Sequence, residues 1–306
     1  MIQSPMDVLR EFPVRKSSKQ KQAFRSAVVG YAASLGYRCS TENSNTGSQN
    51  LVIGNPAKAD YLITAHYDTC ARMFLPNLIT PCNFLGFLGY QIFITLILMC
   101  LPILPGIAVG YALSPQSGYL VWYFGFLALV LLLTNGPANP SNANDNTSGV
   151  IAVLKIAESI PAEYRDKVCF VLFDLEEMGL LGSRAYRRKH KAETNRQIIL
   201  NLDCVGDGDE MVIFPTKKLS KNQDMMDFLR KINHTEGKKS IRVHEKGFSV
   251  YPSDQRNFPY GAGIAAFKRK KGIGLYCDRI HTKRDTVLDE NNVNMLRDRI
   301  IAAITE

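Results

Sequence analysis

The chain has 306 residues and a formal net charge of +9, and 46% of its residues are apolar against 21% charged. These averages are typical of a folded soluble protein and exclude a disordered chain, a collagen-like chain and a small disulfide scaffold. The charges are distributed unevenly, because residues 73–144 contain no Asp, Glu, Lys or Arg. The sequence therefore predicts a charged body with one uncharged, apolar insertion.

Ahead of the insertion, the residue pattern predicts one helix and two short strands. Residues 18–35 carry apolar residues at helical spacing and end before Gly36, and β-rich runs occupy residues 50–53 and 61–65. The second run leads directly into the segment HYDT at residues 66–69. A histidine and an aspartate therefore lie at the carboxyl end of a predicted strand.

The insertion predicts a helical hairpin that crosses a membrane twice. Residues 84–113 and 118–134 are apolar runs of the length that a bilayer span needs, about 17–25 residues. The first run can kink at Pro102 and Pro105, and residues 114–118 have the composition of a tight turn. The alternatives are a buried helical pair, an apolar lid or an oligomer interface. Soluble helices usually keep one charged face, however, and these runs have none.

The charges around the hairpin predict its orientation. Lys58, Arg72 and Lys155 flank it and its turn carries no charge, so the positive-inside rule places the body in the cytoplasm. Residues 1–25 show no apolar run that would export the body. The seven cysteines form no CxxC pair and fit reduced thiols. The basic run 268–271 would meet anionic headgroups if it faced the bilayer, and no basic stripe interleaved with aromatic residues indicates nucleic-acid binding.

Beyond the insertion, predicted helices alternate with predicted strands. Helices are expected at residues 149–160, 179–189, 222–233 and 289–304, and buried strands at 168–173 and 198–202. Such alternation predicts an α/β fold with a mixed sheet covered on both faces. The domain boundaries follow, with a discontinuous body at 1–72 and 135–306 and an inserted membrane hairpin at 73–134.

Charged residues follow the predicted strands, where ligands gather in open α/β sheets. The strand at 168–173 runs into Glu176 and Glu177, and the strand at 198–202 runs into Asp203. If these strands are neighbours of the strand that ends at His66, their polar side chains converge on one edge. Histidine and carboxylate ligands without cysteine suit zinc, or less often manganese or cobalt. The candidate ligands in chain order are His66, Asp145, Glu176, Glu177, Asp203 and His281.

Each candidate alone has a simpler explanation. His66 alone would more often be structural, Glu176 and Glu177 would be a solvated helix start, and Asp145 would cap the helix that begins near Gly149. Only the whole set of residues favours a metal centre.

Five segments together resemble the co-catalytic zinc aminopeptidases, which are family twenty-eight of the metallopeptidases and include the bacterial leucine aminopeptidase and aminopeptidase Y types. The segments are HYDT (66–69), NDNTSG (144–149), FDLEEMGLLGS (173–183), NLD (201–203) and IHTKRDT (280–286). The resemblance implies a three-layer sandwich with a central mixed β-sheet, as in zinc exopeptidases. It also implies hydrolysis of N-terminal residues from peptides. The hairpin lies outside the resemblance and is an insertion in it.

The resemblance also implies a role for each residue and two Zn²⁺ ions per chain. Asp145 would bridge both metals, His66 and Asp203 would complete one, and Glu177 and His281 the other. Glu176 would be the general base acting on metal-activated water, and Asp68 would orient His66. A cis peptide bond is implied between Asp145 and Asn146.

One segment departs from the family pattern, because Gln255 stands where members often carry a histidine near the substrate pocket. Tyr251 or Tyr260 could instead supply a phenol to the reaction's tetrahedral intermediate. Two alternative functions stay open at this point. The first is a glutaminyl cyclase with a single zinc held by an Asp, a Glu and a His. The second is a catalytically inactive scaffold of the same family.

Overall fold

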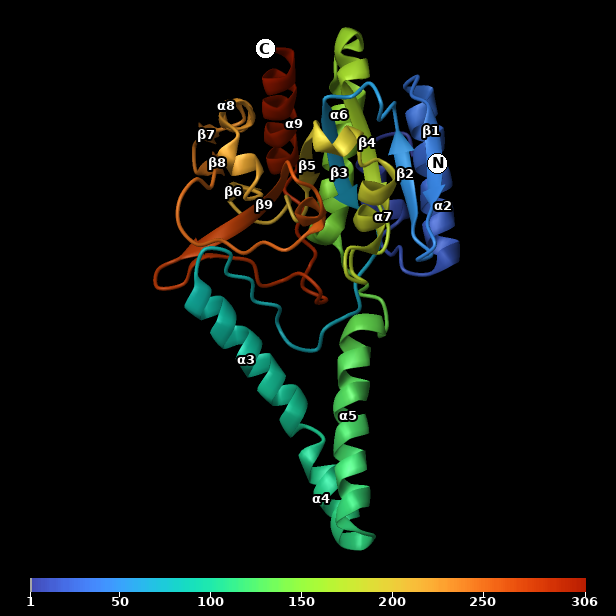
Figure 1. Ribbon diagram of the computed structural model, residues 1–306, viewed down its shortest axis with the longest axis vertical. Coiled ribbons are helices and arrows are strands. Elements are labelled where there is room, and N and C mark those ends of the chain that lie inside the picture. The colour runs from blue at the N-terminus through green and yellow to red at the C-terminus, as the bar shows by residue number, and fades with distance from the viewer. Residues whose placement is uncertain (1) are drawn as a thin grey trace.

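The computed structural model describes residues 2–306, and its body is built on one ten-stranded sheet (Figure 1). The strands are β1 (Cys39–Asn43), β2 (Gln49–Ile53), β3 (Tyr61–His66), β4 (Val168–Phe173), β5 (Ile198–Leu202), β6 (Glu210–Pro215), β7 (His234–Glu236), β8 (Lys239–Val243), β9 (Gly261–Lys270) and β10 (Gly274–Tyr276). Their order is β1-β2-β4-β3-β5-β9-β6-β8-β7, and β10 pairs with β9. The sheet is mixed, as predicted.

The centre of the sheet is parallel. β3 pairs with β4 on one side and with β5 on the other, and β5 pairs with β9, all in parallel. The register aligns His66 with Phe173 and Thr64 with Asn201. The carboxyl ends of four neighbouring strands therefore lie at one edge of the body.

Helices cover both faces of the sheet. The body helices are α1 (Asp7–Glu11), α2 (Ser18–Ser34), α6 (Gly149–Ser159), α7 (Leu181–Lys189), α8 (Gln223–Lys231) and α9 (Glu290–Thr305). The larger apolar core joins the sheet to α2, α6, α8 and α9, and a smaller one joins it to α7. β4 contributes Phe170 and Leu172 to the first core and Val171 and Phe173 to the second, which explains its unbroken apolar sequence.

The first body helix shows how local sequence sets the element ends. The Ser17 hydroxyl accepts from the Gln20 backbone N–H, and the Gln20 side chain accepts from the Ser17 N–H, so a capping box begins α2. The helix ends just before Gly36, which has a positive φ of 88°. The predicted helix at 18–35 is thus confirmed to within one residue.

The insertion forms two apolar arms that project from the body (Figure 1). The first arm is α3 (Phe84–Cys100) followed by α4 (Ile103–Ala112), and the second is α5 (Pro115–Asn135). The break between α3 and α4 falls at Pro102, one of the two predicted kink sites. Both arms are long and apolar enough to cross a membrane.

The predicted turn at residues 114–118 is too long. Ser114 caps α5 by accepting from the Ser117 backbone N–H, and Pro115 occupies the first helical turn. Proline is well tolerated there, because the first helical N–H groups have no intrahelical partner. The proline that suggested a turn therefore begins the helix, and the reversal is confined to Leu113 and Ser114.

Both ends of the hairpin are tied to the body near the strand ends. Ala71 on the outgoing segment forms an isolated antiparallel bridge with Ala138 on the returning segment. Asn83, which caps α3, donates through its side chain to the carbonyl of Ile273 in the β9–β10 turn at 3.0 Å. Phe84 packs edge-on against Phe248. The base of α3 therefore rests on the turn that directly follows β9, whose end carries most of the basic run 268–271.

Candidate metal centre

The strand ends bring the predicted residues together. His66 is the last residue of β3, Glu176 and Glu177 follow β4, and Asp203 follows β5, on three adjacent parallel strands. Asp145 precedes α6, and His281 lies between β10 and α9. Six side chains from five segments consequently border one cavity of about 220 Å³.

Asp145 lies between the two histidines. Its Oδ1 is 3.2 Å from His66 Nε2, and its Oδ2 is 2.9 Å from His281 Nε2. Each histidine also faces a second carboxylate, because His66 Nε2 is 3.6 Å from Asp203 Oδ1 and His281 Nε2 is 3.5 Å from Glu177 Oε1. The arrangement is two histidine–carboxylate groups that share one aspartate.

The backbone around Asp145 is unusual and crowded. The Asp145–Asn146 peptide bond is cis, as the resemblance implied. Gly149, the first residue of α6, lies so close to β5 that a Cβ there would be 2.2 Å from the carbonyl oxygen of Leu202. Glycine is therefore required where α6, the helix that follows Asp145, begins against the sheet.

Two further aspartates hold the proposed ligands in place. Asp68 Oδ1 lies 3.6 Å from His66 Nδ1, and its two oxygens accept from the backbone N–H groups of Glu176 and Glu177 at 3.0 and 3.3 Å. Asp285 accepts from the backbone N–H groups of Asn144 and Asp145 at 2.8 and 3.0 Å. Asp68 thus supports both His66 and the glutamate pair, which extends its predicted role.

The side chain of Arg15, which the sequence did not single out, is buried behind the site. It donates to the carbonyl of Tyr67 at 2.6 Å and to the Thr147 hydroxyl at 3.1 Å. Burial lowers its pKa to about 10, while the charges of Asp68 and Asp145 oppose that change. No sequence signal marks Arg15, because it precedes α2 and lies far along the chain from the motifs.

Crowded, buried acids give the site its electrostatic character. Burial raises the pKa of Glu177 to about 8, with Asp145 adding to the rise and His281 opposing it. Burial likewise raises the pKa of Glu176 well above its usual value. The pKa of His281 rises to about 9 despite burial, because Glu177 and Asp145 face it. Such a cluster is relieved of its mutual repulsion when cations occupy it.

The donor atoms fit metal ions. Within residues 2–306, three groups could each hold an ion. They are His66 with Asp145 and Asp203, His66 with Glu176 and Glu177, and Cys70 with Asp145, Glu177 and His281. The Oε1 atom of Glu177 is buried and has no hydrogen-bond partner among the described residues. Buried polar atoms are rarely left so, and a cation would satisfy this one. Imidazole with carboxylate is a donor set that suits zinc.

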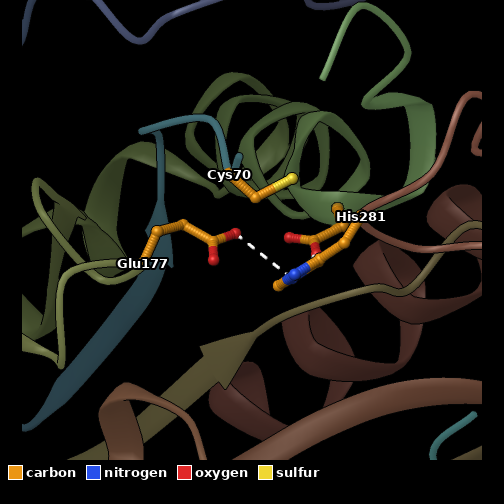
Figure 2. Close-up of side chains that lie close together, drawn as sticks. Cys70, Glu177 and His281 are labelled. Atoms are coloured by element: carbon orange, nitrogen blue, oxygen red, sulfur yellow. Dashed lines mark ion pairs between the residues drawn. The ribbon is translucent and has the colours of Figure 1, made fainter. Parts of the chain in front are cut away.

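Cys70 was not predicted here. Figure 2 shows Glu177 and His281 pointing toward each other, with the Cys70 side chain directed into the same space. Burial raises the pKa of its thiol well above the usual value, and Glu177 and Asp145 add to the rise. The signal available in the sequence was its position four residues after His66.

Of the three predicted pocket residues, Tyr251 lines the cavity, Gln255 lies behind its wall and Tyr260 lies away from it. Tyr251 lines the cavity, and its hydroxyl donates to the carbonyl of Asp203 at 3.1 Å. The Gln255 side chain donates to the Tyr251 carbonyl and accepts from Asn201, so it supports the wall from behind. Tyr260 is not among the residues that line the cavity, and its ring lies under the Lys218 ammonium group.

The hairpin contributes indirectly to the cavity. Asn77 and Ile79, on the segment that leads to α3, line it together with Ile280. Ile79 is held there by an antiparallel bridge to Cys277. The outgoing segment of the insertion is therefore part of the cavity wall.

Solved structures with the same fold include both peptidases and cyclases. Glutaminyl cyclase from Porphyromonas gingivalis aligns with a TM-score of 0.60 at 16% identity, over 98% of this chain and 96% of that one. A leucine aminopeptidase precursor from Bacteroides thetaiotaomicron gives 0.58 at 14%, over 98% and 94%. The Legionella pneumophila LapA aminopeptidase gives 0.57 at 14%, over 98% and 67%. The three-layer fold is therefore that of these enzymes.

Sequence comparison identifies the family. No curated protein matches the chain significantly. The sequence pattern described as peptidase family M28 matches residues 132–304, which is more than half of the chain. The matched part includes Asp145, Glu177 and His281, whereas His66 precedes it. The chain therefore belongs to peptidase family M28.

Proposed function

We propose that the protein is a dinuclear zinc aminopeptidase that removes N-terminal residues from peptides. The observation that carries the proposal is the position of Asp145, whose two oxygens face two different histidines. His66, Asp145 and Asp203 would hold one zinc ion, and Asp145, Glu177 and His281 the other. Bound zinc ions would supply a lowered pKa for attacking water and charge stabilisation for the developing oxyanion.

Glu176 is the proposed general base. It lines the cavity beside His66, and its backbone N–H is held by Asp68. A raised pKa suits a group that must take a proton from water and later give it to the leaving amine. Tyr251 would form part of the substrate-binding wall, with Gln255 positioning it.

Two alternatives remain open to experiment. Asp145, Glu177 and His281 form a complete group on their own, so a single zinc with glutaminyl cyclase activity is the second candidate. An inactive scaffold is the third, although every ligand and the base implied by the resemblance are present.

The test combines metal analysis with the Glu176→Gln variant of the full-length protein in detergent. We expect two zinc ions per chain, hydrolysis of aminoacyl substrates, and a loss of at least about 100-fold in turnover with metal content unchanged. The matched control is Glu163→Gln, which changes an exposed glutamate away from the cavity. One zinc ion per chain, together with cyclisation of glutaminyl peptides, would favour the cyclase. A metal-loaded wild-type protein that turns over neither kind of substrate would favour the scaffold.

We also propose that the hairpin anchors the protein in the cell membrane through residues 84–134, with the body in the cytoplasm. The support is the length and composition of both arms, together with large apolar side chains that the body leaves exposed, such as Leu104, Leu113 and Leu120. Because the cavity edge and the base of the hairpin coincide, substrates would be peptides close to the bilayer.

A further inference from the structure

Cys70 is fixed at the junction of the metal cavity and the hairpin. It follows β3 by four residues, is 1% exposed, and its carbonyl accepts from the Asn139 backbone N–H at 3.1 Å. The adjacent bridge between Ala71 and Ala138 ties together the outgoing and returning segments of the insertion. The thiol is therefore held in position by backbone pairing on both sides of the insertion.

The sulfur atom shares its surroundings with three proposed ligands. Cys70 Sγ, one oxygen each from Asp145 and Glu177, and a ring nitrogen of His281 all lie within 4.8 Å of one another. Figure 2 shows Cys70, Glu177 and His281 around this space. Glu177 Oε1, which faces His281, is the buried oxygen without a hydrogen-bond partner among the described residues. The four converging donors, together with the unpartnered oxygen of one of them, thus indicate a cation at this point.

We propose that Cys70 is a fourth protein ligand of the metal ion held by Asp145, Glu177 and His281. The proposal rests on the metal centre of the proposed function and goes beyond the ligand set that the resemblance implied. The two halves of the centre would then differ, because the His66 and Asp203 half has only nitrogen and oxygen donors.

A thiolate ligand changes what this half of the centre does. Cysteine binds zinc as the thiolate, so one proton is released to solvent when the metal enters. Soft sulfur donors favour zinc over manganese or magnesium. Four protein ligands are typical of zinc sites that hold their ion firmly, whereas catalytic sites keep one position open. The open position would therefore lie at the His66 half, beside Glu176.

A purely structural role explains the surroundings of Cys70 less well. A buried free cysteine usually behaves as a small apolar side chain. The contacts here are polar, since the sulfur lies 3.8 Å from the Asn142 side-chain oxygen and close to three ionisable groups. Cys169, by contrast, is buried among Leu62, Val171 and Ile199. Among the described residues its sulfur donates only to backbone carbonyls, such as that of Ile53 at 3.4 Å, with no ionisable side chain in a metal-binding group beside it.

The test uses the full-length protein in detergent, loaded with zinc or with cobalt. X-ray absorption at the zinc edge should show sulfur at about 2.3 Å, with one sulfur for every two zinc ions. Cobalt-loaded protein should show a sulfur-to-cobalt charge-transfer band in the near ultraviolet. The Cys70→Ser variant should lose both signals and bind one of its two zinc ions at least about 10-fold more weakly in chelator competition.

Two variants identify the source of the sulfur signal. Cys277→Ser removes a buried thiol that belongs to a different cluster and should keep both signals. Cys204→Ser tests the other nearby thiol, whose sulfur lies 3.2 Å from Asp203 Oδ1, and should also keep them. If the wild-type protein with its full zinc content shows no sulfur ligand in the X-ray absorption spectrum, the proposal is overturned. This result does not depend on whether any variant folds.

Activity measured on the same samples separates this proposal from the proposed function. Hydrolysis of aminoacyl substrates without a sulfur signal would refute the ligand role of Cys70 and leave the peptidase standing. A sulfur signal without hydrolysis would leave the ligand role standing and refute the peptidase. A signal that persists in Cys70→Ser would assign the sulfur elsewhere and overturn the proposal.

Discussion

Asp254 carries a buried carboxyl group that the proposed ligand set does not use. Its side chain is fully buried, and neither oxygen has a hydrogen-bond partner among the described residues. Burial raises its pKa to about 7, the charge of His66 opposes the rise, and the charges of Asp68 and Asp203 add to it. The folded protein consequently holds a proton on this group at pH values where the unfolded chain has released it.

This difference predicts a pH-dependent stability in the metal-free protein. Between the unfolded pKa of 3.8 and the folded value of about 7, the folded state binds more protons, so the free energy of unfolding falls as pH rises. Asp254→Asn removes that loss, which is about 1.4 kcal/mol for each unit of pKa difference. Thermal unfolding of both proteins at about pH 5 and about pH 8 measures it. If the stability of the wild type and of Asp254→Asn changed equally between the two pH values, the raised pKa of Asp254 would be contradicted.

Single residues of the site differed in how well the sequence predicted them. His66, Glu177 and Asp203 could be placed together from the sequence because each lies at or soon after the end of a short, β-rich apolar run that predicts a buried strand. Arg15 and Cys70 were not, since their role comes from segments that meet only in the folded chain. Long-range proximity of this kind leaves no periodic pattern in the sequence.

Among the elements, the hairpin arms pack through glycines. A Cβ on Gly118 of α5 would lie 2.5 Å from the carbonyl oxygen of Gly106 and 2.8 Å from the Cα of Gly110, both in α4. Small residues let apolar helices approach closely, which is how helices associate where lipid removes the hydrophobic driving force. The tip of the hairpin is therefore a close helix contact, whereas α3 diverges from α5 toward the body (Figure 1).

We expect Gly118→Val to separate α4 from α5 and destabilise the hairpin by about 1–3 kcal/mol, the usual cost of overpacking. Thermal unfolding of the full-length protein in detergent should show a lower midpoint. Gly89→Val in α3 is the matched control, because a Cβ there has nothing within 4 Å. Equal midpoints for the two variants would show that the helix contact contributes nothing to stability.

The sequence predicted β3, β4 and β5 of the sheet centre well, but it missed β9 beside them and the strands beyond it. β3, β4 and β5 were each predicted to within about a residue, because buried parallel strands have nearly continuous apolar sequences. The strands from β6 to β10 were not predicted. β7 and β10 have only three residues each, and β8 carries charged residues, so neither length nor alternation marks them.

At the scale of the whole molecule, the charges are arranged about the base of the hairpin. Arg72, Lys246, Lys270 and Lys271 are exposed on the body side, near the segments that lead into α3. The far end of the hairpin has no charged residue, because residues 73–144 contain none. Membrane proteins usually keep the basic end of a span in the cytoplasm. The charge distribution about this hairpin is of that kind.

The orientation predicts which parts of the chain a protease reaches in sealed, inside-out membrane vesicles. A cleavage site inserted at Gly272, in the exposed β9–β10 turn, should be cut at once, because the proposed orientation puts this turn on the cytoplasmic side, which faces outward in inside-out vesicles. The same site inserted between Leu113 and Ser114 should be protected until detergent opens the vesicles. Cutting at both sites without detergent would refute the membrane crossing. The reverse pattern would place the body, and with it the metal centre, on the opposite side, since both lie at the same end of the hairpin.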